Sequence, residues 1–521
     1  MVKFSDQIYQ QKLKKIKREL NKFLSRTDDK LFLQFMWSIN TLQTEFRGNV
    51  KRYLSFPRSA YGAPLGSDYA LPKWEIETLL TLLFTTDKRP KIQINYDNFE
   101  TIVPVINNLR KLENHENRLT CTEDKIFYEL HRIGQRQFGW QRGFHSSERL
   151  YRYVFIYGQG SCATNFENKY GFTIEQFLKV SCVLYTQLSN SPWIKPIEIP
   201  VLDVTQELID KTLSLISLPL SDLRVDAQTL IKKTIEGGRI PTAYLPGSLR
   251  KFPIIRSPQD QNILISPLSQ LIMYRATVGL YYDMINSAPS KKDADQAITE
   301  ANDRFEQYVG MVIEKFCPRF KAFPSEQYGP KKARIDTPDV LLIDNEEVTT
   351  VFECKATKLT FEAQFSEHPF ETSDKAYAQI VKAVTQLWRF FSHVRIGKYT
   401  ERKISDTANA VVLTIDSWMQ MSHALQGRVF AQAKKVLEDD PNVLDVDMRP
   451  IIFCSIQDLV DVMYISDEDN LLKTFANAAL PKYAGWRIVE IRRDFGIDVQ
   501  KKFPLNVEEV LPWWNVINSS R

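Results

Sequence analysis

The stretch Thr337–Thr360 reads TPDVLLIDNEEVTTVFECKATKLT and decides the fold of the C-terminal half of the chain. Val340–Ile343 is a short apolar run, and Val348–Ala356 is a longer one rich in β-branched and aromatic residues, so both are predicted to be strands. The polar residues Asp344–Glu347 between them predict a turn. The stretch therefore predicts a β-hairpin.

Three charged side chains come together in this hairpin. With the turn centred near Asn345–Glu346, Asp339 before the first strand lies beside Glu353 in the second. Glu353 and Lys355 are two residues apart, and a strand places such residues on the same face. The hairpin thus predicts two acids and a lysine at one end of a strand pair.

These charges stand on an otherwise apolar strand, where burying them is costly unless something compensates them. A divalent metal would do so, because carboxylate oxygens are the ligands that Mg²⁺ prefers and the ion keeps several waters for chemistry. A lysine beside the metal can orient or deprotonate an attacking water, or stabilise the negative charge that develops on phosphorus. The grouping therefore indicates metal-assisted hydrolysis.

The spacing resembles the PD-(D/E)xK nuclease superfamily, because Pro338–Asp339 is followed, after thirteen residues, by Glu353–Cys354–Lys355. The resemblance covers residues 298–460. It implies an Mg²⁺-dependent endonuclease that hydrolyses DNA, with Mn²⁺ as an alternative ion and RNA left open as a substrate. It also implies that Asp339, Glu353 and the backbone carbonyl of Cys354 bind the metal, and that Lys355 serves the nucleophilic water.

A structural alternative is a surface hairpin with a cross-strand Glu–Lys pair. Glu-x-Lys occurs four times, and the copies at Glu123–Lys125, Glu167–Lys169 and Glu401–Lys403 lie in polar or loop-like surroundings. Only Glu353–Lys355 stands on an apolar strand after the only Pro-Asp of the chain. This context, and not the tripeptide, favours the nuclease site.

The helix predicted over Ile298–Phe316 supplies a further candidate. In the superfamily, a helix before the sheet often carries another acid in a Phe-Glu-x-x-Val-like run, and Phe305–Val309 fits that pattern. The resemblance therefore implies a catalytic role for Glu306 in the outer metal shell, with a solvated glutamate as an equal alternative. Glu314 is a weaker candidate, and Glu326, near a predicted edge strand, is interpreted as structural.

A stripe of hydrogen-bond donors follows the hairpin, on the helix predicted over Asp374–His393. Its spacing of 4, 3, 4 and 3 residues suits a phosphate backbone, although an ordinary solvated face is an equal alternative. Gln386–Phe390 resembles the Gln-x-x-x-Tyr element of some superfamily members, with Phe390 in place of tyrosine. The candidate nucleic-acid-binding residues are Lys375, Gln379, Lys382, Gln386 and Arg389 on this helix, and Lys331, Lys332 and Arg334 before the hairpin.

Further strands are predicted at Ala410–Ile415 and Pro450–Ile456, with helices at 418–438 and 457–464. This order predicts an α/β (α+β) domain with a central mixed sheet flanked by helices. The resemblance implies that it is a nuclease domain. A large, mostly helical N-terminal region precedes it, and a short helical tail follows.

The chain is predicted to divide into four regions. Residues 1–235 form a helix-rich recognition or regulatory region, and residues 236–295 connect it to the nuclease domain at 296–465, which the helical tail 466–521 follows. The connecting segment is predicted to hold short strands, a long helix over Leu268–Ile285 and a polar linker at Asn286–Asp295.

Composition sets broad limits on the class of protein. The chain has 521 residues, is 43% hydrophobic and has a net charge of only +5, which neither identifies nor excludes a nucleic-acid partner. Residues 1–22 hold seven cations and two anions, so their net charge of 7 − 2 = +5 equals that of the whole chain. We interpret this segment as a solvated amphipathic helix, with contact to phosphates or to an anionic membrane as the alternative. The six cysteines form no CxxC pair, which argues against a zinc cluster or a disulfide framework.

No apolar stretch follows the basic N-terminal residues, and no run reaches the length of a membrane helix. We therefore expect a cytoplasmic protein without a membrane partner. The resemblance implies DNA as the partner and a role in prokaryotic anti-phage or restriction-type defence, with the N-terminal region sensing a protein trigger or targeting the nuclease; a homodimer is also open. The alternative is a catalytically inactive nuclease-fold protein that acts as a nucleic-acid-binding or assembly module.

Overall fold

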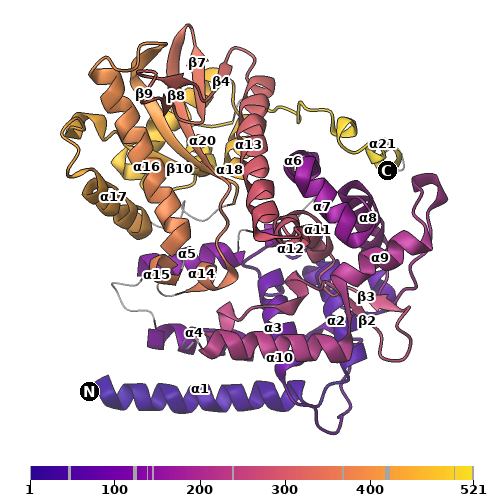
Figure 1. Cartoon of the computed structure of the whole chain (residues 1–521). Helices are drawn as coiled ribbons and strands as arrows, with labels where there is room; N and C mark the ends of the chain where they lie inside the picture. The colour runs from indigo at the N-terminus through magenta and orange to yellow at the C-terminus, as the bar shows by residue number, and fades with distance from the viewer. Residues whose placement is uncertain are drawn as a thin grey trace.

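The chain folds into a mixed α/β structure in which a five-stranded sheet flanked by helices stands above a helical N-terminal half (Figure 1). The computed structural model describes residues 2–44, 49–120, 126–137, 139–142, 146–236, 240–366, 369–372, 374–416, 423–497 and 499–518.

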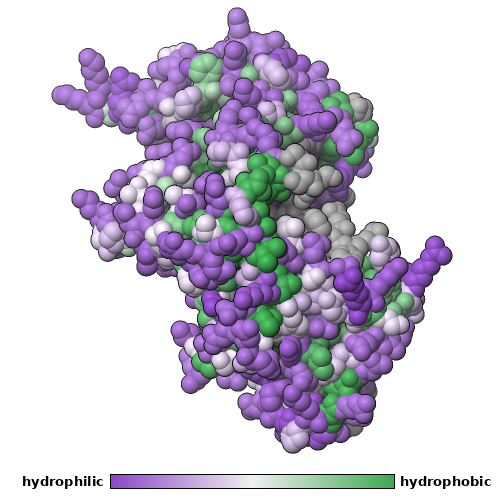
Figure 2. Space-filling model, turned by 90° about the vertical axis from the view of Figure 1, so that its right-hand side faces the viewer, coloured by the Kyte–Doolittle hydropathy of each residue, from purple (hydrophilic) through white to green (hydrophobic). Residues whose placement is uncertain are grey.

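One face of the molecule is mostly hydrophilic, with hydrophobic residues gathered in a narrow band near its middle (Figure 2). Within the described ranges, no helix combines the length and the apolar composition needed to cross a membrane.

The N-terminal half is built from amphipathic helices in two groups. α6 to α9 and α12 belong to a core shared with α13 and the central sheet, whereas α1 to α4 and α10 surround a separate apolar core. Trp37 of α2 is buried in this core and donates from Nε1 to the carbonyl of Leu188 in α8 at 2.7 Å. A small sheet of order β1-β2-β3 completes this half. Its elements are α1 (Val2–Leu24), α2 (Asp29–Leu42), α3 (Lys73–Thr85), α4 (Val103–Thr120), α5 (Ile126–Gln137), α6 (Ser147–Tyr157), α7 (Gly160–Tyr170), α8 (Ile174–Asn190), α9 (Gln206–Ile216), β1 (Ser217–Pro219), α10 (Leu220–Glu236), β2 (Ile254–Arg256), β3 (Leu264–Ile265), α11 (Gln270–Thr277) and α12 (Leu280–Ser287).

The central sheet has the order β10-β9-β8-β7-β4. β4, β7 and β8 pair antiparallel, whereas β8, β9 and β10 are parallel and therefore need crossover connections, which contain α16 and α17. The elements of this half are α13 (Lys291–Phe316), β4 (Lys321–Pro324), β5 (Gln327–Tyr328), β6 (Ile335–Asp336), β7 (Val340–Asp344), β8 (Glu347–Lys355), α14 (Phe361–Phe365), α15 (Pro369–Thr372), α16 (Asp374–Arg395), β9 (Lys403–Thr414), α17 (His423–Leu437), β10 (Ile451–Ser455), α18 (Ile456–Tyr464), α19 (Glu468–Ala478), α20 (Ile488–Arg493) and α21 (Trp514–Asn518).

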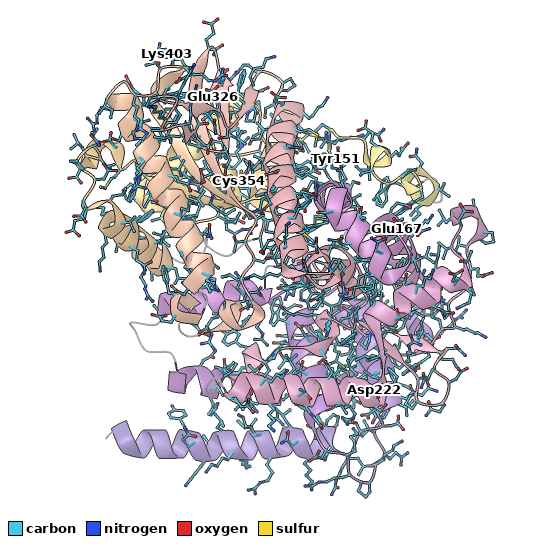
Figure 3. All side chains as sticks on the ribbon, in the orientation of Figure 1. Tyr151, Glu167, Asp222, Glu326, Cys354 and Lys403 are labelled. Carbon is cyan, nitrogen blue, oxygen red and sulfur yellow. The ribbon has the colours of Figure 1, made fainter. Side chains whose placement is uncertain are left out.

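The two ends of β8 lie in different surroundings. Its first residue, Glu347, pairs with Lys403 at the outer end of the sheet, whereas Cys354 near its last residue lies at the end closer to the N-terminal helices (Figure 3). Because side chains alternate along a strand, Val351 packs in the core beneath α16, and Phe352 packs in the core beneath α13 and α18. The sheet is thus covered on both faces.

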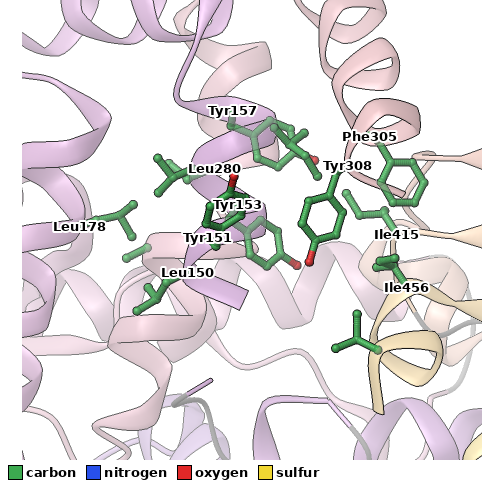
Figure 4. Packing of buried hydrophobic residues seen from close by; sticks show 14 of the residues in the cluster. Leu150, Tyr151, Tyr153, Tyr157, Leu178, Leu280, Phe305, Tyr308, Ile415 and Ile456 are labelled. Carbon is green, nitrogen blue, oxygen red and sulfur yellow. The ribbon is translucent and has the colours of Figure 1, made fainter. Parts of the chain in front are cut away.

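The core on the α13 face continues into the N-terminal half. Tyr308 of α13 packs near Tyr151 of α6, and its hydroxyl donates to Glu148 Oε1 at 2.7 Å (Figure 4). The predicted linker Asn286–Asp295 is therefore wrong as a linker, because α12 runs into it and α13 begins at Lys291 behind the capping residue Ser290. The division of the chain into four regions stays a prediction.

Two further expectations are corrected. The helix predicted over Leu268–Ile285 is broken at Gly279, where an added Cβ would lie 2.2 Å from the carbonyl oxygen of Arg275, and glycine also weakens a helix. The tail contains short helices separated by extended segments, because Pro481, Pro504 and Pro512 interrupt it. It is less helical than expected.

Candidate active site

The hairpin of β7 and β8 has the geometry that its sequence predicts. Its turn residues Asn345 and Glu346 have φ values of 48° and 68°, the left-handed conformation that two-residue hairpin turns require. Val340 pairs with Phe352, so Asp339, one residue before β7, falls opposite Glu353. The carboxylates of the two strands therefore meet at one end of the pair.

Two hydrogen bonds fix the charged side chains of this end. The Cys354 N–H donates to Asp339 Oδ2 at 2.6 Å, and Lys355 Nζ donates to Glu353 Oε1 at 2.7 Å. The Glu353 side chain is 1% exposed, and that of Lys355 is 14% exposed. The structure thus brings Asp339, Glu353 and Lys355 together in a nearly closed environment.

The electrostatics of this cluster are those of an acid-rich site. Burial and the adjacent Asp339 charge raise the pKa of Glu353 to about 7. Burial also raises the pKa of Asp339, against the opposing effect of the Lys355 ammonium. Burial lowers the pKa of Lys355, but the charges of Glu353 and Asp339 outweigh it and leave that pKa raised. Lys355 therefore stays protonated beside carboxylates that resist ionisation.

Glu306 joins the cluster from α13. Burial raises its pKa to about 8, and the charge of Asp339 is the next largest cause. The other two acids of this part of the chain have structural partners. Glu314 accepts a hydrogen bond from the backbone N–H of Ala322 at 2.9 Å. Glu326 accepts from the guanidinium of Arg402 and from the Tyr399 hydroxyl, which fits the structural role expected for it.

The donor set fits a divalent cation. Glu353 Oε2 is buried and has no hydrogen-bond partner, so one oxygen of the most buried acid is left for a ligand. The N–H of Cys354 points towards Asp339, and in a strand the carbonyl of the same residue points to the same side. Among the described residues, no group of three or more His, Cys, Asp or Glu side chains is placed so that it could hold a metal ion by itself. The candidate set is two carboxylates and one backbone carbonyl.

Of the predicted stripe on α16, Lys382 acts on the site itself. It is exposed, and its charge lowers the pKa of both Asp339 and Glu353. Gln379 and Lys375 are exposed one and two turns before it. Arg389 forms an ion pair of 3.3 Å with Asp440 and is therefore committed to the protein.

Gln386 is half-buried, and its Oε1 atom is buried without a partner. The basic residues before the hairpin lie in a segment that contacts the C-terminal part of α16, where the Tyr328 hydroxyl and His393 Nδ1 are 2.7 Å apart. Lys331, Lys332 and Arg334 are exposed in the connection between β5 and β6, and Arg334 donates to the carbonyl of Gln327 at 3.1 Å. Two of the eight predicted residues, Arg389 and Arg334, thus bond to groups of the protein, and the nucleic-acid-binding role of the set stays a prediction.

Sequence reasoning missed an ion pair next to the site. Lys358 Nζ lies 3.3 Å from Asp416, and the Lys358 side chain is buried over the rings of Tyr153 and Tyr281. Asp416 comes two residues after the end of β9, and Lys355 at the end of β8 is paired with Thr414. The available signal was the rule that the carboxyl ends of parallel strands meet at one edge of a sheet.

Comparison with known proteins adds no relative, because no family model, curated protein or solved structure matches the chain.

Proposed function

We propose that this protein is a metal-dependent phosphodiesterase that hydrolyses DNA, with a catalytic centre similar to those of PD-(D/E)xK nucleases. The observation that carries the proposal is the cluster at the end of β8, where Lys355 bonds Glu353, Asp339 accepts from the backbone N–H of Cys354 between them, and Glu353 Oε2 lacks a partner. A buried group of acids without compensating arginines is costly unless it binds a cation. Mg²⁺ or Mn²⁺ is the cation class that such oxygen ligands select.

Each residue has a role in the proposed chemistry. Asp339, Glu353 and the carbonyl of Cys354 would hold the ion, which when bound supplies an activated water and neutralises phosphate charge. Lys355 positions the attacking water or donates a hydrogen bond to the phosphate oxygens, since its pKa is raised and it stays protonated. Glu306, with a pKa of about 8, can hold a proton near this centre at neutral pH.

The test is a cleavage assay on supercoiled, linear and single-stranded DNA and on RNA, with Mg²⁺ or Mn²⁺ and with EDTA as a control. We expect EDTA to abolish cleavage, and Lys355→Ala and Asp339→Ala to reduce the rate by about 10²–10³-fold. The matched control is Lys403→Ala, because Glu401–Lys403 is an exposed copy of the same tripeptide.

Cleavage at the wild-type rate in both site variants would show that the assignment of the site is wrong. Tight binding of nucleic acid without turnover in any metal would favour the inactive, nucleic-acid-binding form of this fold.

A further inference from the structure

The excess positive charge of the chain is concentrated on one helix, α1. Residues 1–22 hold seven of the 68 lysines and arginines and two of the 63 acids, so 68 − 7 = 61 cations and 63 − 2 = 61 acids remain for the rest of the chain. Charges of both signs in equal number keep a surface free of a strong local field. The rest of the chain is balanced in this way, whereas α1 is not.

One face of α1 is packed into the N-terminal half. The helix lies at the edge of the molecule beside α4 (Figure 1). Its residues Leu13, Leu20 and Leu24 are 4%, 2% and 0% exposed in the core that α1 to α4 and α10 surround. Lys17, at the border of this face, forms an ion pair of 2.7 Å with the buried Glu116 of α4. The helix is therefore held in a fixed orientation.

The opposite face of α1 carries cations that have no partner in the protein. At about 100° of rotation per residue, four cations fall within about 100° of one another, on the side opposite the buried leucines. These residues, which we call the basic face, are Lys14, Lys15, Arg18 and Lys22. All four side chains are exposed, and within the described ranges none of them forms an ion pair. Glu19, the exposed acid of the helix, lies outside this arc.

The basic face is unfavourable for the helix by itself. Arg18 has a like charge four residues before it, at Lys14, and another four residues after it, at Lys22. Like charges at this spacing are neighbours on a helix surface, and their repulsion lowers the stability of the helix. A polyanion that lies along the basic face would remove this repulsion.

We propose that the basic face of α1 binds the phosphate backbone of duplex DNA outside the site of cleavage. Lys14, Arg18 and Lys22 follow one another at about 6 Å along the helix axis, so they form a line of charge about 12 Å long. Duplex DNA carries one phosphate per about 1.7 Å of its axis, and lysines and arginines bind it by releasing its counterions. The choice of DNA over another polyanion rests on the proposed function.

An anionic membrane fits this helix less well than DNA. An amphipathic helix binds a membrane surface by burying its apolar face at the boundary between headgroups and acyl chains. In α1 that face is already buried in the protein, as the exposures of Leu13, Leu20 and Leu24 show. Only the charged face is left, and it suits a partner that is bound by charge without insertion.

The experiment measures the binding of fluorescently labelled duplex DNA to the full chain in EDTA at several salt concentrations. The variant Arg18→Ala with Lys22→Ala removes two neighbouring cations of the basic face. The matched control, Lys434→Ala with Lys435→Ala, removes two exposed lysines of α17. We expect the α1 variant to reduce the slope of log affinity against log salt by about 1.8, which is about 0.9 for each phosphate contact, and to lower the affinity at least about tenfold.

A slope and an affinity equal to those of the wild type in the α1 variant would overturn the proposal. Equal reductions in the α1 variant and in the α17 control would also overturn it, because they would show a general effect of net charge.

Further measurements separate a binding role from a structural one. Both substituted side chains of α1 are exposed, alanine favours a helix, and the repulsion between like charges is relieved, so Tm should stay equal or rise. Arg18→Lys keeps the charge and should keep the wild-type salt slope. A slope reduced as much by Arg18→Lys as by Arg18→Ala would refute a contact made through charge.

Vesicles of phosphatidylserine and phosphatidylcholine test the membrane as the partner. We expect the α1 variant to lose more affinity for DNA than for vesicles, since α1 has no free apolar face to insert. Loss of vesicle binding with unchanged DNA binding would assign the basic face to a membrane and overturn the proposal.

The outcome is independent of catalysis, because binding is measured in EDTA. DNA binding through α1 without cleavage in any metal would overturn only the proposed function. Cleavage of DNA by the wild type, with an unchanged salt slope in the α1 variant, would overturn only this inference.

Discussion

Two regions of the molecule bury several charges, and they do so in opposite ways. In the N-terminal half, several buried acids each meet an arginine that occupies both of their oxygens. Glu77 accepts from Arg250 at 2.7 and 3.0 Å, and Glu113 accepts from Arg136 at 2.6 and 3.1 Å. Such two-point pairs satisfy the carboxylate and leave nothing for a ligand.

The cluster at the end of β8 is not balanced in this way. Glu306, Asp339 and Glu353 face the two lysines Lys355 and Lys382, so the acids exceed the bases by one when all are charged. The pKa values of all three acids are raised, with burial as the largest cause. The comparison shows two ways of burying carboxylates. A carboxylate that is paired with an arginine is neutralised within the fold, whereas an excess of buried carboxylates remains unfavourable until a cation binds.

The largest expected effect comes from breaking a balanced pair. Arg136→Leu leaves Glu113 buried without its partner and should lower the free energy of unfolding by about 3–5 kcal/mol. Urea denaturation measures this change, and cleavage per folded molecule should not change. The double variant Glu113→Leu with Arg136→Leu should recover most of the loss; a double variant as unstable as the single one would show that the ion pair is not the cause.

Removing an acid from the unbalanced cluster should have the reverse profile. Glu353→Gln should reduce cleavage by about 10²–10³-fold and weaken Mn²⁺ binding, without lowering Tm in the metal-free protein. Its side chain has an unpartnered oxygen and a raised pKa, so the charge that is lost was not stabilising. Calorimetric titration with Mn²⁺ and a cleavage assay check both parts, with Glu401→Gln as the exposed control. A large drop in Tm with normal cleavage in Glu353→Gln would show that this acid stabilises the fold and does not take part in catalysis.

The pH dependence of stability sharpens the comparison further. The pKa of Glu306 is raised from its ordinary value of 4.5 to about 8, so between these values the folded protein holds a proton that the unfolded chain has lost. Stability in EDTA should therefore fall as the pH rises through this window and level off above it. Glu306→Gln should remove this contribution. The difference between the Tm of this variant and the Tm of the wild type should therefore increase from pH 5 to pH 8.

Glu314→Gln, on the same helix, is the matched control, and it should keep the wild-type pH profile because Glu306 is still present. Parallel profiles of Glu306→Gln and wild type across the window would contradict the electrostatic picture of the cluster.

The hairpin could be predicted from sequence because its information is local. Alternation along β8 and the turn at Asn345–Glu346 are enough to set Asp339 opposite Glu353. The strand β10 and the second half of β9 follow from short apolar runs in the same way, whereas the mostly polar residues 403–409 of β9 were not predicted as a strand. The role of the cluster stays a prediction.

The features that sequence missed depend on contacts between distant segments. The bond from Tyr308 to Glu148 spans 160 residues, and it carries the core across the position where a linker was expected. The pair Lys358–Asp416 likewise joins the ends of two strands. Neither composition nor periodicity predicts such contacts between distant segments, because they depend on how the helices pack in three dimensions.

The smallest effect concerns Lys382, which links the acid cluster to solvent. It is exposed on α16. Burial raises the pKa of Asp339 and Glu353, and the charge of Lys382 partly opposes this rise, so Lys382 lies near the acids. Lys382→Ala should weaken DNA binding severalfold, and it should reduce the slope of log affinity against log salt by about 0.9, the value of one phosphate contact. Binding is measured in EDTA at several salt concentrations. Lys435→Ala on α17, also exposed, is the control. Equal slopes for the two variants would mean that the stripe on α16 is an ordinary solvated face. In that case α16 would not contribute to substrate binding, and the acid cluster would bind only its cation.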